Sequence, residues 1–370
     1  MDPIHRPNYR PLIQRLALPW LLVVPGLLAV VTIAILVIHT DLNIVALYSQ
    51  CHARSRLSGL SHIPVLGAPA CFLVSFFQYA NTSVRAIARM SVILSFVGAL
   101  LTISLVESAR ICNKSSRVIS KPTLPWLVSN LVGGVLVWDL VIVSSYLSQA
   151  KNVQAARESA SAEDAREADP EIDKGVRGLS SQVEAMAIPI AVVVGFIVPS
   201  VVMLVLTHPI TIGVWLFFPI WVSTVRYAVK FVAMKVVTDP GPYHLESHRV
   251  PLVTMYAVPV ICSVLSHGFL IWNMFAWDDR KEMTRATIKF IEIDVAIIAV
   301  TILYWLLVEA GVVACVTMIA ISILMGPGAG LAVAWFLREK AFDVYYQGTQ
   351  GSSDREGDVE DESEETPLLR

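Results

Sequence analysis

The residues best suited to chemistry are carboxyl groups inside apolar runs. The run IEIDVAIIAVTILYWLLVEAG, residues 291–311, is apolar enough to cross a membrane, yet it contains Glu292, Asp294 and Glu309. Removing a carboxyl group from water disfavours its charged form, raises its pKa and favours the protonated acid. Because charge at membrane depth is energetically costly, an ionisable residue there is a functional hypothesis by default. A protonated carboxyl group in such a place could give its proton to a substrate that also lives in lipid.

Four residues of this run share one face of the predicted helix. At 100° per residue, Asp294, Thr301, Trp305 and Glu309 fall within about 60° of one another. Asp294 and Glu309 would lie about 22 Å apart along the axis. Glu292 lies on the opposite face near the start of the helix, where it can reach the lipid headgroups. The shared face therefore predicts a polar stripe that meets a neighbouring helix.

Two further acids lie in other apolar runs. Asp139 follows Trp138 deep within residues 124–148, and Glu107 ends the run at 87–107. A buried carboxyl group destabilises a fold unless it is paired, so Asp139 and Asp294 are hard to explain as purely structural residues. Glu107 is also explained as a solvated residue at the end of a span. The predicted catalytic residues are Asp139, Asp294, Glu309 and Glu107.

Aromatic and polar residues close to these acids form the predicted substrate-binding set. The face of an aromatic ring stabilises a cation held over it, so acids among aromatic walls suit a carbocation cascade. The structural alternatives are tryptophans in the interfacial belt, an ion pair of Arg226 that holds helices together, and His267 as a core hydrogen-bond donor. The set consists of Trp138, Trp215, Trp221, Arg226, His267, Tyr304 and Trp305.

The sequence predicts neither a metal nor a cofactor. Asp278-Asp279 in WDDRKEM lacks the third acid of a DDxxD magnesium site, and no GxxxxGK[ST], HExxH or GxSxG motif occurs. The five cysteines are scattered, without metal-binding spacing. The net charge of −2 gives no sign of nucleic-acid binding. These absences favour a reaction that begins with protonation over one that begins with loss of diphosphate.

The elements that position these residues are apolar runs of about 20 residues, the length that crosses a bilayer. The chain is 55% apolar and 16% charged, whereas a soluble domain carries about 25% charged residues. We therefore predict an all-α, polytopic integral membrane helical bundle with eight or nine transmembrane helices. The run at 63–80 is the weakest because Pro64 and Pro69 make it a candidate re-entrant or interfacial segment. The predicted runs are 17–39, 63–80, 87–107, 124–148, 185–207, 209–232, 251–273, 288–309 and 311–337.

Charge divides the chain into four parts. Residues 1–150 hold the first four helices, 151–180 form a charged, solvent-exposed linker, 181–345 hold the remaining helices, and 346–370 form a disordered acidic tail. The loop after the third helix and the linker after the fourth are both basic and are expected on opposite sides, so the positive-inside rule does not fix the orientation. Likewise only one of the two sequons, at Asn81 and Asn113, can carry a glycan if the third helix spans.

A longer stretch carries a resemblance to a known family. Residues 181–225, SQVEAMAIPIAVVVGFIVPSVVMLVLTHPITIGVWLFFPIWVSTV, contain a proline-broken helix followed by a W-x₃-P-x-W element. In this stretch, in its length of 370 residues, in its eight or so predicted helices and in its polar linker, the chain resembles fungal membrane-bound terpene cyclases of the ascofuranone and macrophorin pathways. The residues that carry the resemblance are Pro189, Gly195, Pro199, Trp215, Pro219 and Trp221.

The resemblance implies an enzyme of secondary metabolism in the endoplasmic reticulum membrane. Members of that family cyclise the farnesyl chain of a meroterpenoid, or its terminal epoxide, by acid attack on the alkene or epoxide end. The implied partners are a lipophilic prenylated small molecule and the lipid bilayer, with no metal and no release of diphosphate. The resemblance assigns no catalytic position, so the predicted proton donors rest on the residues alone.

The main alternative function is proton-coupled transport across a vacuolar or endosomal membrane. The sequence GPGAG at 326–330 interrupts the last apolar run, and broken helices and buried acids are typical of transport sites. The tail, with Glu364 before Leu368-Leu369, resembles an acidic dileucine sorting signal. Against transport stand the absence of an internal repeat and the small number of polar residues. A cyclase predicts an apolar cavity lined by aromatics with one acid, whereas a transporter predicts a polar path open to one side.

Overall fold

The computed structural model describes residues 12–39, 67–163, 178–236 and 241–340, with a few residues between 44 and 49. The predicted acidic tail lies outside the described residues, as does most of the second half of the predicted linker. The helical segments, in chain order, are α1 (Leu12–Arg15), α2 (Leu18–His39), α4 (Gly67–Ala80), α5 (Val84–Ala109), η2 (Ile111–Asn113), α6 (Arg117–Ser120), α7 (Thr123–Val132), α8 (Gly134–Val137), η3 (Trp138–Val143), α9 (Ser144–Glu163), α11 (Glu184–Val192), η4 (Val193–Ile197), α12 (Val198–Leu206), α13 (Pro209–Leu216), α14 (Phe218–Ala233), η5 (Leu245–Ser247), α15 (Arg249–Met274), α16 (Glu282–Ala310) and α17 (Val312–Met325), followed by a last helix over 327–340.

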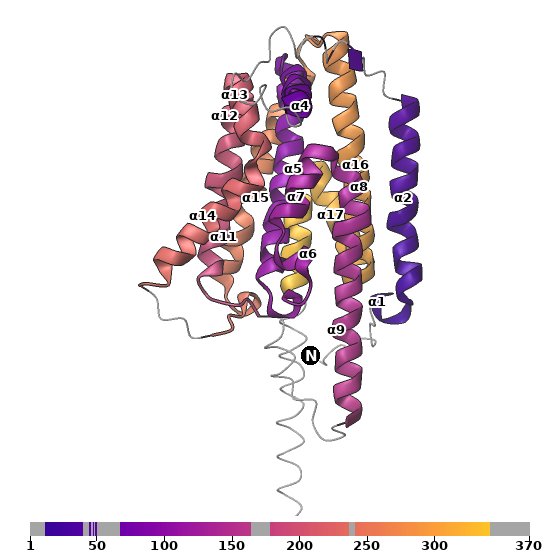
Figure 1. Cartoon of the computed structure of the whole chain (residues 1–370), viewed down its shortest axis with the longest axis vertical. Helices are drawn as coiled ribbons and strands as arrows, with labels where there is room; N and C mark the ends of the chain where they lie inside the picture. The colour runs from indigo at the N-terminus through magenta and orange to yellow at the C-terminus, as the bar shows by residue number, and fades with distance from the viewer. Residues whose placement is uncertain are drawn as a thin grey trace, which may run out of the picture.

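These helices form an elongated bundle, with α5 near its centre and α2 on its outside (Figure 1). Five helical stretches are long and apolar enough to cross a membrane: α2, α5, the continuous run of α11, η4 and α12, α15, and α16. A sixth is counted if α13 and α14, which meet at 61°, form one bent span. The predicted all-helical fold is therefore confirmed, and the long apolar helices fit a polytopic membrane protein, but within the described residues they do not reach the predicted eight or nine spans.

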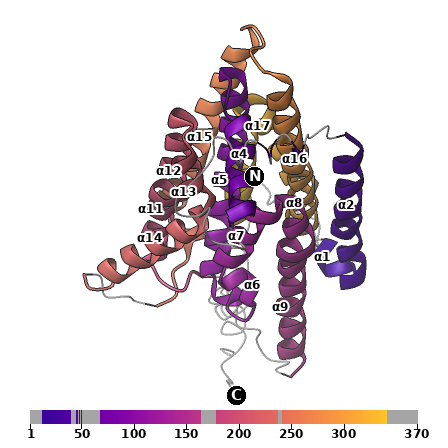
Figure 2. The same cartoon turned by 45° about the horizontal axis from the view of Figure 1, so that its top comes forward.

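Residues 124–148, predicted as one span, form a helical hairpin. The first arm, α7, ends at Gly133, whose φ of 134° is open to glycine and rarely to other residues. The second arm runs back through α8, η3 and α9. The rings of Trp126 and Trp138 lie 5.4 Å apart, whereas twelve residues along a straight helix would separate them by about 18 Å. The hairpin therefore enters and leaves the bundle at the same end, as both views show (Figures 1 and 2).

The last predicted span, 311–337, is a second hairpin. Its first arm, α17, ends at Gly326, with φ of 91°, and the 327–340 helix runs back beside it. A Cβ at Gly330 would overlap the carbonyl oxygen of Met318, so glycine allows the two arms to touch. A Cβ at Gly328 would lie 2.7 Å from the carbonyl oxygen of Ser95 in α5. The GPGAG break therefore allows close packing of helix backbones.

The two hairpins change which loops share an end of the bundle. Arg110, in the loop that follows α5, is paired with Leu179 at the end of the linker, and Leu179 is paired in turn with Tyr243. The basic loop after α5 and the charged linker therefore lie at the same end, and the prediction that they lie on opposite sides was wrong. We call this end the basic end, after its exposed residues Lys114, Arg117, Lys121, Lys235 and Arg249.

Both sequon asparagines are buried. The side chain of Asn81, at the opposite end from the basic end, is 2% exposed. Asn113, at the basic end, is 6% exposed and its Nδ2 donates to the Glu107 carboxylate at 3.1 Å. Neither side chain is open to a glycosylating enzyme in the folded protein, so the predicted glycosylation gains no support.

Glycine also sets how closely α14 approaches the proline-broken helix. A Cβ at Gly195 in η4 would lie 2.6 Å from the backbone nitrogen of Val222 in α14. We expect Gly195→Ala to lower the free energy of unfolding by about 1–3 kcal/mol because the two backbones must separate. Gly268 in α15 has open space around it, so Gly268→Ala is the matched control and is expected to stabilise by up to about 1 kcal/mol. Thermal unfolding in detergent distinguishes them, and equal effects would contradict the packing.

The distribution of charge predicts the orientation in the membrane. Among the described residues, the opposite end exposes three basic side chains, Lys281, Arg285 and Lys289, against the five of the basic end. Because Lys and Arg are enriched on the cytosolic side, the basic end is expected to face the cytosol. A glycosylation acceptor inserted between residues 163 and 178 should stay unmodified, and one inserted after Trp277 should be glycosylated. The reverse pattern would contradict this orientation.

Candidate active site

A cavity of about 600 Å³ lies among α4, α5, the hairpin of α7 and α8, the bend between α13 and α14, and α16. Its volume is within the range of about 300–1,000 Å³ that small-molecule sites occupy. Its wall consists of aliphatic side chains, many of them from α5 and α16, and of nine aromatic rings. The aromatic residues of the wall are Phe72, Phe76, Phe77, Phe96, Trp126, Trp138, Trp215, Phe218 and Phe290.

These rings hold one another in place around the cavity. Phe77 and Trp215 meet edge to face at 4.9 Å between ring centroids, and Phe76 meets Phe290 in the same way at 5.7 Å. Contacts of this kind add about 0.5–1.5 kcal/mol per pair beyond the area buried. The indole nitrogen of Trp215 donates to Ser200 at 2.9 Å, so its polar atom points away into the protein. The wall therefore presents ring faces and edges rather than polar atoms.

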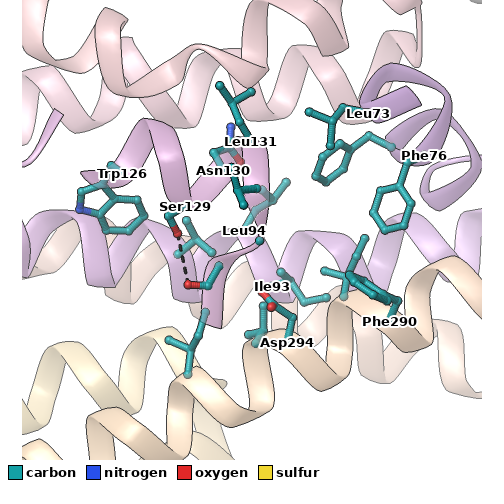
Figure 3. A pocket seen from close by; sticks show the side chains of 18 of the residues that line it. Leu73, Phe76, Ile93, Leu94, Trp126, Ser129, Asn130, Leu131, Phe290 and Asp294 are labelled. Atoms are coloured by element: carbon teal, nitrogen blue, oxygen red, sulfur yellow. Dashed lines mark hydrogen bonds between the residues drawn. The ribbon is translucent and has the colours of Figure 1, made fainter. Parts of the chain in front are cut away.

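Polar side chains of the cavity wall gather at the tip of the α7–α8 hairpin. The lining residues with polar side chains in the described part of the chain are Ser129, Asn130 and Asp294. Figure 3 shows Ser129 and Asn130 on α7 and Asp294 on α16, with Phe76 and Phe290 to one side. Asp294 is the lone acid among them, and the described lining residues include no Lys, Arg or His.

The hairpin tip fixes the position of Asp294. The backbone N–H of Val135, in the first turn of the returning arm, donates to Oδ1 of Asp294 at 3.1 Å. A Cβ at Gly134 would lie 2.6 Å from Oδ2 of the same carboxyl group, so the tip must be glycine for Asp294 to approach it. The N-terminal turn of a helix has free N–H groups and a partial positive charge, which stabilise a carboxylate. The tip therefore holds the one acid of the cavity by its backbone.

The predicted polar stripe of α16 does meet one neighbour, the returning arm of this hairpin. Below Asp294, Thr301 donates to Oδ1 of Asp139 at 2.7 Å. One further turn along, Trp305 stacks on Tyr146 with 4.5 Å between ring centroids. Asp139 is fully buried, its Oδ2 has no hydrogen-bond partner among the described residues, and it does not line the cavity. The two acids therefore lie at different levels of the bundle, one in the cavity and one behind its wall.

Glu107 and Glu309 belong to an ion cluster near the basic end and do not line the cavity. Arg338 donates to Glu309 at 2.6 Å and to Glu107 at 3.0 Å. Arg110 donates to Glu107 at 3.1 Å and to Glu339 at 2.6 Å. Burial by itself lowers the pKa of the Arg110 guanidinium, but the carboxylates of Glu339 and Glu107 hold it well above its usual range. This cluster ties the end of α5 to α16 and to the last helix.

The other predicted binding residues are spread over the bundle. Trp138 and Trp215 line the cavity, and their contact with a substrate stays a prediction. Trp221 is 42% exposed on the outside of α14. Arg226 pairs with Glu184 at 2.8 Å and donates to Ser108, which is the structural alternative considered for it.

His267, Tyr304 and Trp305 also lie away from the cavity. His267 packs against Gly326 at the tip of the second hairpin. The Tyr304 hydroxyl donates to the carbonyl of Leu21 in α2 at 2.9 Å. Trp305 is 1% exposed within the core, between Tyr146 and Trp335.

Sequence reasoning missed the cavity residues of α4 and α7. Phe72, Phe76 and Phe77 lie in the run that was weakest as a span, and they recur on one face of α4. Ser129 and Asn130 lie just before Gly133-Gly134, a pair inside the run at 124–148 that was predicted as one helix. The adjacent glycines were the signal that could have revealed the hairpin, because they favour a break in a helix.

The chain matches the family model described as the CtvD domain over residues 63–276, more than half of its length. The matched residues include α4, α5, the α7–α8 hairpin and the α13–α14 bend, whereas Asp294 on α16 follows them. No curated protein and no solved structure matches the chain.

The ion cluster is expected to stabilise the fold. Glu107→Gln would leave Arg110 and Arg338 with one carboxylate fewer in a buried setting, so we expect a loss of about 3–5 kcal/mol in the free energy of unfolding. Glu292→Gln breaks a partly exposed pair with Arg89 and should change stability by at most about 1 kcal/mol. Unfolding in detergent checks both, and an unaffected Glu107→Gln variant would contradict this role.

Proposed function

Because the chain belongs to the CtvD domain family, which is associated with terpene cyclases, we propose that it is an integral membrane terpene cyclase. The observation that carries the proposal is a single acid, Asp294, in a large cavity with aromatic walls. The proposed substrate is a lipophilic prenylated molecule, and the reaction is closure of its farnesyl chain, or of the terminal epoxide of that chain. The resemblance of residues 181–225 to ascofuranone- and macrophorin-type cyclases supports this choice of substrate.

The first step is proton transfer from Asp294. The carboxyl proton adds to the CH carbon of the terminal alkene, and a tertiary carbocation forms at the neighbouring dimethyl-substituted carbon. With the epoxide, the proton adds to the oxygen, the bond from that oxygen to the tertiary carbon breaks, and the cation forms at the same carbon. The Asp294 carboxylate that remains keeps its hydrogen bond from Val135, at 3.1 Å, which stabilises it. Because one carboxyl oxygen of Asp294 is held in place, its proton points in one direction, and only one end of a bound prenyl chain receives that proton.

Ring closure follows without further help from charged residues. The π electrons of the next alkene attack the cation and form a carbon–carbon bond, which moves the positive charge along the chain. Ring faces such as those of Trp138, Trp215 and Phe218 stabilise the cation. Loss of a proton from carbon, back to Asp294, gives a product with the mass of the substrate. The acid is thereby restored, and the reaction is an isomerisation.

The proposed location is the endoplasmic reticulum membrane, where a lipophilic substrate reaches the enzyme through the bilayer. The apolar cavity does not favour the alternative of transport. A hydrophilic solute needs a polar path, whereas among the described residues only three polar side chains line this cavity. Asp139, Glu107 and Glu309, which would serve a proton relay, lie outside the cavity, and the two glutamates are bonded to Arg338.

The proposal is tested by replacing the two buried aspartates separately. Microsomes that contain the protein are given a farnesylated phenol or its epoxide, and products of equal mass are separated by chromatography and mass spectrometry. Asp294→Asn keeps the shape of the side chain but removes the proton, so we expect product formation to fall at least about 100-fold.

Asp139→Asn is the matched control, because Asp139 is a buried acid outside the cavity. This variant should keep product formation within a few fold of the unmodified protein. Cyclisation that survives in Asp294→Asn would exclude Asp294 as the donor, and loss in Asp139→Asn alone would assign the proton to Asp139. No cyclised isomer from either substrate with the unmodified protein would contradict the proposed function.

A further inference from the structure

The polar part of the cavity differs from its surroundings in what it can bind. Ser129 and Asn130 lie in the last turn of α7, one helical turn before the hairpin tip. The last turn of a helix has free carbonyl groups and a partial negative charge. The described lining residues offer no Lys, Arg or His, and Asp294 is close to the same tip. The N–H of Val135 on the returning arm is already directed at Asp294, so the described residues at this end of the cavity offer a ligand hydrogen-bond acceptors and no cation. This end therefore disfavours phosphate and carboxylate groups and favours a neutral hydrogen-bond donor.

Asn130 is held with one of its two polar atoms occupied. Its Nδ2 donates to the carbonyl of Leu216 at 2.7 Å. That carbonyl is at the α13–α14 bend, where the N–H of Ile220 bonds to Phe217 instead, so Leu216 needs another donor. The amide nitrogen of Asn130 is thereby directed toward the bend.

The remaining polar atom of Asn130 is the Oδ1 acceptor. It makes no hydrogen bond with the described residues, although the side chain is one of those that line the cavity. A hydrogen-bond acceptor without a partner in an apolar cavity destabilises the protein unless a ligand supplies the donor. Figure 3 shows Asn130 among the lining side chains of α7, with Leu131 beside it.

We propose that Asn130 is a specificity-determining residue whose Oδ1 accepts a hydrogen bond from a hydroxyl group of the substrate. The substrate class is then a neutral prenylated compound with a free hydroxyl group, in preference to an ether, a carboxylate or a phosphate. This inference rests on the proposed function for the identity of the ligand, and it adds how the ligand is chosen and held.

The position of Asn130 also predicts how the prenyl chain of the substrate is folded in the cavity. Asn130 precedes the hairpin tip by three residues, and Asp294 is bonded to Val135 just after the tip. The hydroxyl group and the bond that receives the proton are therefore held at the same end of the cavity. A long prenyl chain between them must fold back on itself along the aromatic wall, which is the shape that ring closure needs.

The first test compares probes on the unmodified protein. Binding of farnesol, farnesyl methyl ether and farnesoic acid is measured on the protein in nanodiscs by competition with tritium-labelled farnesol. One hydrogen bond predicts that farnesol binds about fivefold to tenfold more tightly than the ether. Farnesoic acid, as a carboxylate, should bind more weakly than farnesol. Equal binding of alcohol and ether, or tighter binding of the acid, would overturn the proposal without any variant.

The second test assigns the preference to Asn130. In Asn130→Leu the ratio of ether to alcohol dissociation constants should fall to about one, because the acceptor is gone while the apolar wall remains. If Asn130 served only to satisfy Leu216, both probes would weaken together and the ratio would be unchanged. Ser129→Ala is the matched control and should keep the ratio. A ratio lost in Ser129→Ala and kept in Asn130→Leu would contradict the assignment.

These measurements are independent of turnover. A clear alcohol preference that depends on Asn130, without any cyclised product, would sustain the binding site and contradict the proposed function. Cyclised product together with a ratio of one in the unmodified protein would sustain the function and contradict the role of Asn130.

Discussion

The candidate active site depends on one hydrogen bond between a broken helix and an acid. The N–H of Val135 meets Asp294 because the chain turns at Gly133 and starts a new helix inside the bundle. An unbroken helix at 124–148 would have used that N–H for its own backbone, and Asp294 would have faced a closed helix surface. The break frees backbone donors on one arm and carbonyl groups on the other. The same turn thus places an acid and a group of hydrogen-bond acceptors at one end of an apolar cavity.

Buried acids have two different kinds of partner in this fold, arginine side chains near the basic end and backbone N–H groups in the cavity. Near the basic end, Glu107, Arg110, Glu309, Arg338 and Glu339 form a cluster in which each side chain has an oppositely charged partner. Pairing of this kind is what a low-dielectric interior requires of structural charge. In the cavity, Asp294 has backbone partners and no cation among the lining residues. The cluster fixes how helices meet, and the cavity keeps its acid available to a ligand.

The sequence predicted an all-helical fold and singled out Asp294, but it did not predict which side chains meet across the bundle. Apolar runs identified the membrane helices, since the length of a run reflects the thickness of the bilayer. Helical periodicity predicted the stripe of Asp294, Thr301, Trp305 and Glu309. The first three contact the returning arm, whereas Glu309 pairs with Arg338 on the last helix. Periodicity could not show which arginine reaches Glu107 or Glu309 across the bundle, because those contacts depend on the path of the chain. The hairpins were missed because hydropathy alone does not distinguish one span from two short arms.

The measurement that tests the central claim most directly is the origin of the hydrogen that starts ring closure. The acidic proton of Asp294 exchanges with solvent, whereas the carbon-bound hydrogens of a prenyl substrate do not. A reaction run in deuterium oxide with a farnesylated phenol that lacks the epoxide should give a cyclised product with one deuterium, at the former CH carbon of the terminal alkene. Mass spectrometry and NMR locate the label. A cyclised product without deuterium at that carbon would contradict initiation by an acid of the protein.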